Sequence, residues 1–202
     1  MPAPAAIAVH RLGPRHAPAL VRHLLRLDAE DRRLRFGRPM RDEALRAYVA
    51  GIDFERDRVF GIFDPGLELA GFAHLAMDDA TGQAELGLSV DTVHRGRGYG
   101  SALLRRAVLY AANRGYRALY MHCLADNAAM LHLARKAGLR TVVSAGEADA
   151  WLALDRARHG GALREALEDQ FALIDHLLRQ QHAWFSRLPR PDHAAENRAS
   201  VS

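Results

Sequence analysis

The stretch ELGLSVDTVHRGRGYG, residues 85–100, decides the fold of this chain, and the helix-like stretch SALLRRAVLYAANRG follows it at residues 101–115. In its first half Leu86, Leu88 and Val90 alternate with other residues, as in a half-buried strand. Its second half is rich in glycine, which lets a backbone approach a ligand closely. Because the first N–H groups of a helix attract anions, the stretch predicts a strand, a glycine loop and a helix that together bind a phosphate-bearing ligand.

The arginines and the glycine spacing refine this prediction. Arg95 and Arg97 carry guanidinium groups, which can grip phosphate oxygens in a fork. The loop reads G-x-G-x-G rather than the G-x-G-x-x-G of a dinucleotide-binding fold, so a Rossmann domain is disfavoured. A tight turn without a ligand would use the same glycines, and the loop alone leaves both interpretations open.

The composition is that of an ordinary globular protein, with 202 residues of which 49% are hydrophobic and 26% charged. A formal net charge of +4 suits an anionic ligand, but the basic residues are spread over several segments, which makes nucleic acid an unlikely partner. Cys123 is the single cysteine, and no Cys/His cluster has the spacing of a zinc site. We therefore expect neither an internal disulfide nor a metal.

The sequence shows no targeting signal or membrane-spanning segment. Residues 1–12, MPAPAAIAVHRL, lack the pattern of a secretory signal, and no apolar run reaches the roughly 18 residues of a membrane span. We expect a soluble, cytoplasmic protein that does not bind a membrane.

Apolar periodicity and turn residues predict an α/β fold with a mixed sheet. The expected strands cover residues 6–12, 59–64, 67–78, 85–90, 118–125, 139–144 and 150–155, and the expected helices cover residues 14–27, 42–54, 101–113 and 128–136. Short turns make the middle strands antiparallel, whereas the strand–helix–strand unit over residues 85–125 requires a parallel pair. The sheet should have about six to seven strands, flanked by helices. The charged segment 28–46 is either a solvated face or the rim of a pocket.

The chain divides into three parts. Residues 1–155 form the predicted domain, and Gly160-Gly161 marks its boundary. Residues 160–188 form a predicted amphipathic helix that either packs on the domain or serves as a homodimer arm. Residues 189–202 are polar and contain prolines, so we expect them to be disordered.

Two motifs resemble the GNAT superfamily of N-acetyltransferases over residues 7–155. The first is the acyl-CoA loop, Arg/Gln-x-x-Gly-x-Gly/Ala, matched by Arg95, Gly98 and Gly100. The second is an asparagine eleven residues before a glycine–hydrophobic pair, matched by Asn127 and Gly138. Residues 27–37, LDAEDRRLRFG, are also similar to the acetyltransferase domain of bacterial protein lysine acetyltransferases.

The resemblance implies an acetyl-CoA-dependent N-acetyltransferase with no metal. The parallel strands 85–90 and 118–124 would splay apart to admit the pantetheine arm of acetyl-CoA, and the loop amides would hold its diphosphate. The residues implied in binding acetyl-CoA are Leu88, Ser89, Val90, Arg95, Gly96, Arg97, Gly98, Tyr99, Gly100, Ser101, Asn127 and Arg135.

The resemblance also implies catalytic roles. Glu85 would be the general base that deprotonates the amine, and Asn127 would lie at the mouth between the strands; a solvated Glu85 and a simple helix cap at Asn127 leave the same sequence pattern. A backbone N–H near Leu88 or Ser89 would meet the oxyanion. The family's usual tyrosine acid, seven residues after the asparagine, is replaced here by Ala134.

The expected reaction is direct attack of a primary amine, a protein lysine or a small amine, on acetyl-CoA in a ternary complex. Ala134 in place of tyrosine motivates one alternative, a non-catalytic sensor that binds acyl-CoA.

Overall fold

The computed structural model describes residues 7–154 of the chain. Its strands are β1 (His10–Leu12), β2 (Arg58–Phe63), β3 (Leu69–Asp78), β4 (Gln83–Val90), β5 (Ala118–Leu124), β6 (Arg140–Ser144) and β7 (Glu147–Ala153). Its α-helices are α1 (Ala17–Arg26), α2 (Ala29–Phe36), α3 (Asp42–Ala50), α4 (Tyr99–Asn113) and α5 (Ala128–Lys136). The predicted helix at residues 160–188, its dimer contact and the tail at residues 189–202 lie outside the described residues.

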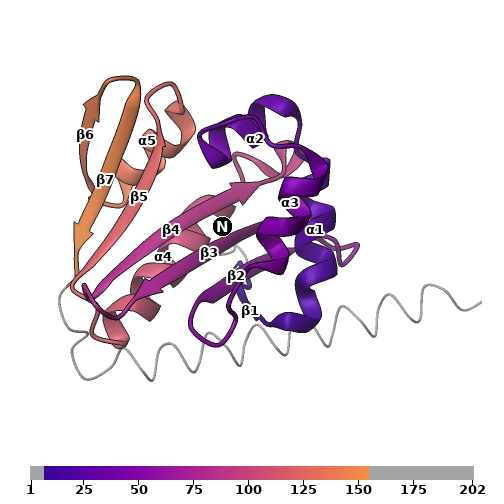
Figure 1. Ribbon diagram of the computed structural model, residues 1–202, viewed down its shortest axis with the longest axis horizontal. Helices are drawn as coiled ribbons and strands as arrows, with labels where there is room; N and C mark the ends of the chain where they lie inside the picture. The colour runs from indigo at the N-terminus through magenta and orange to yellow at the C-terminus, as the bar shows by residue number, and fades with distance from the viewer. Residues whose placement is uncertain (1–6, 155–202) are drawn as a thin grey trace, which may run out of the picture.

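The strands form one mixed sheet of seven, in the order β1-β2-β3-β4-β5-β7-β6, which confirms the predicted fold class. Neighbouring strands are antiparallel except for β4 and β5, which are parallel and joined through α4. This is the predicted crossover. Helices cover both faces of the sheet, with α1 and α3 on one side and α4 and α5 on the other (Figure 1).

The two faces have separate apolar cores. One core joins α4 and α5 to the sheet through residues such as Leu86, Leu103 and Leu119. The other joins α1 and α3 to the opposite face through residues such as Leu24 and Phe72. The neighbours Phe72 and Ala73 of β3 therefore belong to different cores, as the period of a strand requires.

Several element boundaries differ from the predictions. The helix predicted over residues 42–54 ends at Ala50, since the carboxylate of Asp53 accepts hydrogen bonds from the N–H groups of Glu55 and Arg56 and closes a turn there. The first strand is limited to His10–Leu12. The last strand begins at Glu147, before the predicted residue 150, because it pairs with β5 along its whole length.

Candidate active site

The feature of most functional interest is a cavity of about 410 Å³ at the carboxyl end of β4, between α2, the glycine loop and α5. Strands β4 and β5 pair only over Gln83–Glu85 and Ala118–Tyr120. Beyond that point they diverge toward the end where α2 and α5 lie (Figure 1). The splaying implied by the family resemblance is present, and the cavity lies beyond the last paired residues, at Leu88, Ser89 and Val90 of β4.

Most of the predicted binding residues line this cavity. They are Leu88, Ser89, Val90, Arg95, Gly96, Gly98, Tyr99, Gly100, Ser101 and Asn127. The structure places Arg97 and Arg135 outside the lining, and Lys136 lines it instead of its neighbour Arg135. The side chain of Arg135 donates to the carbonyl oxygen of Leu131, one turn back on α5.

The glycine loop has the backbone of an anion site. Gly96 and Gly98 adopt φ angles of 73° and 82°, a region that favours glycine. Gly98 is the N-cap of α4, which therefore begins at Tyr99, two residues earlier than predicted. Within the described residues, no acceptor is recorded for the amide N–H groups from Gly96 to Ser101. A run of free amides at a helix start is the arrangement that holds phosphate oxygens.

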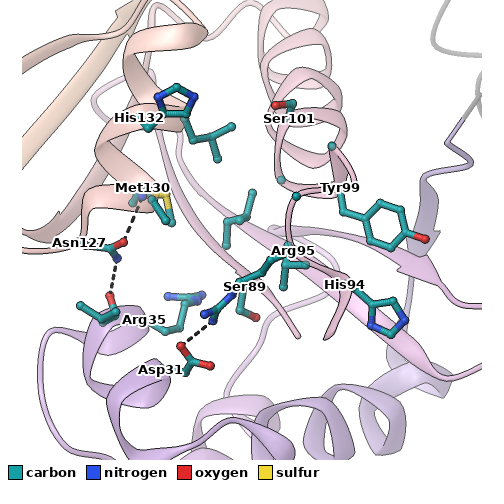
Figure 2. A pocket seen from close by; sticks show the side chains of 18 of the residues that line it. Asp31, Arg35, Ser89, His94, Arg95, Tyr99, Ser101, Asn127, Met130 and His132 are labelled. Atoms are coloured by element: carbon teal, nitrogen blue, oxygen red, sulfur yellow. Dashed lines mark hydrogen bonds and ion pairs between the residues drawn. The ribbon is translucent and has the colours of Figure 1, made fainter. Parts of the chain in front are cut away.

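The loop is fixed to α2 by a buried carboxylate. Asp31 accepts from Arg95 at 2.5 Å with one oxygen and from the hydroxyl of Thr92 at 3.0 Å with the other. Figure 2 shows the ion pair of Asp31 with Arg95 beside the cavity. The guanidinium of Arg95 thus ties the loop to α2, and the free loop amides remain for an anion.

Asn127 bridges the two sides of the cavity mouth. Its side-chain oxygen accepts from the N–H of Met130 and caps α5, while its amide nitrogen donates to the carbonyl oxygen of Leu34 on α2, at 3.2 Å (Figure 2). The residue is buried. Asn127 is therefore a helix cap and also lines the cavity, and the structure does not require a choice between these two positions.

Ser89 on the cavity wall is held by a histidine of α1. His23 is fully buried, and its Nδ1 lies 2.8 Å from the carbonyl oxygen of Leu69 and 3.1 Å from a carboxylate oxygen of Asp91. Since a carbonyl oxygen only accepts, Nδ1 carries the hydrogen, and Nε2 accepts from the Ser89 hydroxyl at 2.9 Å. Burial lowers the pKa of His23 and so favours the neutral ring. The charge of Asp91 opposes this effect but is the smaller of the two.

Glu85 lies at the other end of β4, in a second cavity of about 480 Å³. Tyr120, His122 and Asp149 line the same cavity. A hydrogen bond from His122 to Asp149, 2.8 Å long, raises the pKa of this histidine. Glu85 is solvent-exposed and lines no part of the first cavity, so the predicted base and the predicted loop face different openings along one strand.

Ala134, which stands where the family has its tyrosine, lies in the core. Ala134 is 1% exposed and packs with the residues that join α5 to the sheet. Of the side chains that could protonate the thiolate instead, Tyr99 and His132 line the first cavity, whereas Tyr120 and His122 line the second. Cys123 is buried, and burial raises the pKa of its thiol, so a nucleophilic role for it is disfavoured.

Sequence reasoning missed several residues of the cavity wall. Those from the charged segment are Asp31, Leu34 and Arg35, and the others are Leu27, His94, Ala129, Met130 and Leu133. The pocket-rim interpretation of the segment 28–46 had pointed to the first group. The apolar members of α5 could have been found from the helix face that follows Asn127.

No group of three or more His, Cys, Asp or Glu residues in the part of the chain that the structure describes could hold a metal ion. Between residues 7 and 154, no helix combines the length and apolarity needed to cross a bilayer.

Comparisons with known proteins agree with this geometry. The GNAT domain of the PAT protein of S. lividans has a TM-score of 0.62 and 22% identity, with 72% of this chain and 89% of that chain covered. Spermidine N-acetyltransferase from Vibrio cholerae, solved with CoA and spermine, has a TM-score of 0.60 and 17% identity, with 76% and 98% covered. RimL, a ribosomal L7/L12 α-N-protein acetyltransferase solved with coenzyme A, has a TM-score of 0.58 and 20% identity, with 76% and 98% covered.

These likenesses show the fold, and no protein with a curated description matches the chain. The sequence itself matches the acetyltransferase (GNAT) family over residues 21–139, more than half of its length. That match covers α2, the glycine loop and α5, the three elements that form the cavity. The chain is therefore an acetyltransferase that belongs to the GNAT family, whose members use acetyl-CoA.

Proposed function

We propose that this protein transfers an acetyl group from acetyl-CoA to a primary amine by direct attack in a ternary complex. The observation that carries the proposal is the set of loop amides without acceptors, placed where β4 and β5 diverge. The diphosphate of acetyl-CoA binds these amides. Its pantetheine arm runs along the apolar wall formed by Leu88, Val90 and Leu133 toward the point where the strands separate.

The backbone of β4 provides the electrophilic part of the site. In an antiparallel pair, alternate residues direct their N–H groups away from the partner strand. Since β5 has left β4 beyond Glu85, N–H groups near Leu88 and Ser89 that point away from β3 have no strand partner there. Such a fixed donor stabilises the oxyanion of the tetrahedral intermediate without reorganisation.

Glu85 is the proposed general base. A primary ammonium has a pKa of about 10.4, so only about one molecule in a thousand carries a free lone pair at neutral pH. Glu85 lies four residues from Ser89 on the same face of β4. From the second cavity it can take the proton of an amine directly or through water, while acetyl-CoA occupies the first cavity.

Departure of the coenzyme A thiolate does not need a tyrosine. A thiol has a pKa of about 8.5, which makes the thiolate a tolerable leaving group. Tyr99 and His132 line the cavity and could donate a proton to the departing thiolate.

The test combines binding with turnover. Calorimetry with coenzyme A should show binding, and release of free thiol from acetyl-CoA should depend on an amine. The panel includes a lysine peptide, a peptide N-terminus and a polyamine, because structural neighbours act on a ribosomal protein and on spermidine. Binding without turnover on any amine would identify the acyl-CoA sensor, and absence of binding would end the proposal.

Replacing Glu85 tests the base. Glu85→Gln should lower kcat/KM by about 10²- to 10⁴-fold and change the pH profile of kcat/KM. Glu43→Gln, at an exposed position in the first turn of α3, is the matched control and should leave both unchanged. An unaltered rate and pH profile in Glu85→Gln would remove this residue from the mechanism.

A further inference from the structure

The guanidinium of Arg35 lines the cavity and has no carboxylate partner among the described residues. Helix α2 also carries Arg32, which pairs with Asp42, and Arg33, which pairs with Glu30 and Asp126. Arg35, on the same helix, has no carboxylate within 4.0 Å among the described residues, and its Nε is buried without a hydrogen-bond partner. A guanidinium in that state has hydrogen-bond donors to offer to a ligand.

The guanidinium of Arg35 lies against Gly87 of β4, at the centre of the proposed site. A Cβ atom added at Gly87 would come within 2.2 to 2.5 Å of three guanidinium atoms of Arg35, so glycine is what makes room for it. Glu85, Gly87 and Ser89 share one face of β4, since strand residues alternate. Arg35 therefore lies between the proposed base and the serine of the first cavity, and Figure 2 shows its side chain on the α2 side of that cavity.

A chain of hydrogen bonds fixes the guanidinium in place. Nη2 of Arg35 donates to the hydroxyl of Tyr48 at 3.1 Å, and this hydroxyl donates to Nδ1 of His74 at 2.7 Å. Nε2 of His74 donates to the buried carboxylate of Asp57 at 3.0 Å. The rings of Phe36 and Tyr48 lie beside the guanidinium, with its Cζ atom 4.9 Å and 5.8 Å from their centroids. Only one of its five N–H groups is used by Tyr48.

This preorganised cation would select an anion of matching shape. A carboxylate accepts two parallel N–H···O bonds from a guanidinium, a geometry that a neutral group cannot reproduce. The diphosphate of coenzyme A is assigned to the loop amides, whereas Arg35 lies against Gly87, between the proposed base and Ser89 on β4. A carboxylate at Arg35 must therefore come from the reacting end of one of the two substrates.

We propose that Arg35 binds a carboxylate carried either by the acyl group or by the amine acceptor, so that one of the two natural substrates is acidic. This inference rests on the proposed acyl transfer and names its substrate class. A dicarboxylic acyl-CoA would place its distal carboxylate at Arg35, and an amino acid or acidic amine would place its own carboxylate there.

Matched substrates separate these two sources. Succinyl-CoA and butyryl-CoA have acyl groups of equal carbon number, and they are compared with one amine that lacks a carboxylate. An α-amino acid and its carboxamide are compared with acetyl-CoA as donor. We expect the carboxylate-bearing member of one pair to have a kcat/KM about 10- to 100-fold higher than its neutral match.

Two variants should abolish that preference by different routes. Arg35→Met removes the charge, and Gly87→Ala displaces the guanidinium while leaving the charge in the chain. Each should bring the ratio close to one. Arg38→Met, at an exposed position just after α2, is the control and should keep the wild-type ratio. Ratios near one in the wild type, or a ratio that survives Arg35→Met, would overturn the proposal.

Binding measurements distinguish the absence of a carboxylate site from the absence of acetyl transfer. Calorimetry compares succinyl-CoA with butyryl-CoA on the free protein, and the amino acid with its carboxamide on the protein saturated with coenzyme A. A preference that depends on Arg35 supports the carboxylate site even if no amine is acetylated. Equal affinities within both pairs contradict it even if acetyl transfer is rapid.

Discussion

The buried His23 should make the protein sensitive to mild acid. Its side chain is fully buried, and burial lowers its pKa below the usual 6.5. The unfolded chain then binds a proton below pH 6.5 that the folded chain refuses, so stability falls as pH decreases. Between pH 7.5 and 5.0, a histidine that stays neutral when folded costs up to about 2 kcal/mol, from about 1.4 kcal/mol for each pH unit below 6.5.

Urea unfolding at the two pH values, followed by circular dichroism, measures this loss. His23→Gln keeps a donor and an acceptor for Leu69 and Ser89 but cannot titrate. The difference in the free energy of unfolding between pH 7.5 and 5.0 should therefore be smaller in the variant, by up to about 2 kcal/mol. His74 acts in the same direction, since burial lowers its pKa too, and it remains in both proteins.

The control is His132→Gln, at an exposed position on α5, which should keep the wild-type pH dependence. His23→Gln could also keep the wild-type pH dependence of the free energy of unfolding, to within about 0.5 kcal/mol. In that case His23 would not be a neutral buried ring in the folded protein.

Three other substitutions test the cavity. Gly98→Ala places a side chain at φ 82° and should cost about 1–2 kcal/mol, seen as a lower Tm or a weaker Kd for coenzyme A, while Gly13→Ala, at φ −126°, should change neither. Asp31→Asn removes the ion pair with Arg95 and should raise KM for acetyl-CoA several-fold with little change in kcat; an equal loss in kcat would contradict a purely positional role. Ala134→Tyr should destabilise the fold by about 1–3 kcal/mol without raising kcat, and a faster enzyme would show that this position can reach the thiol.

Local patterns were enough to predict the sheet and the loop. The alternation of Leu86, Leu88 and Val90 and the glycines behind them are properties of adjacent residues, and the structure has the strand, the loop and the helix where these patterns place them. Boundaries failed where a contact from outside the segment decided them. The start of β7 depends on its pairing with β5, which lies more than twenty residues earlier.

The parts of the site that the sequence did not predict are contacts between distant residues. Asp31 and Arg95 are 64 residues apart, and His23 and Ser89 are 66 apart. Neither pair has a motif, because each exists only once α1 and α2 are folded against β4. Arg35 shows the same limit, since in sequence it is one of many charges between residues 28 and 46.

Helix α2 connects the two halves of the site that the diverging strands leave apart. It contacts the glycine loop through Asp31, the N-terminus of α5 through Leu34, and the centre of β4 through Arg35. Arg33 adds an ion pair of 2.6 Å to Asp126, beside the N-cap of α5. Strands β4 and β5 no longer pair beyond Glu85 and Tyr120, and α2 contacts both of them there. Helix α2 therefore carries the proposed carboxylate-binding residue, Arg35, and also holds the loop that is proposed to bind acetyl-CoA. Binding of acetyl-CoA and selection of the acidic substrate thus depend on one short helix.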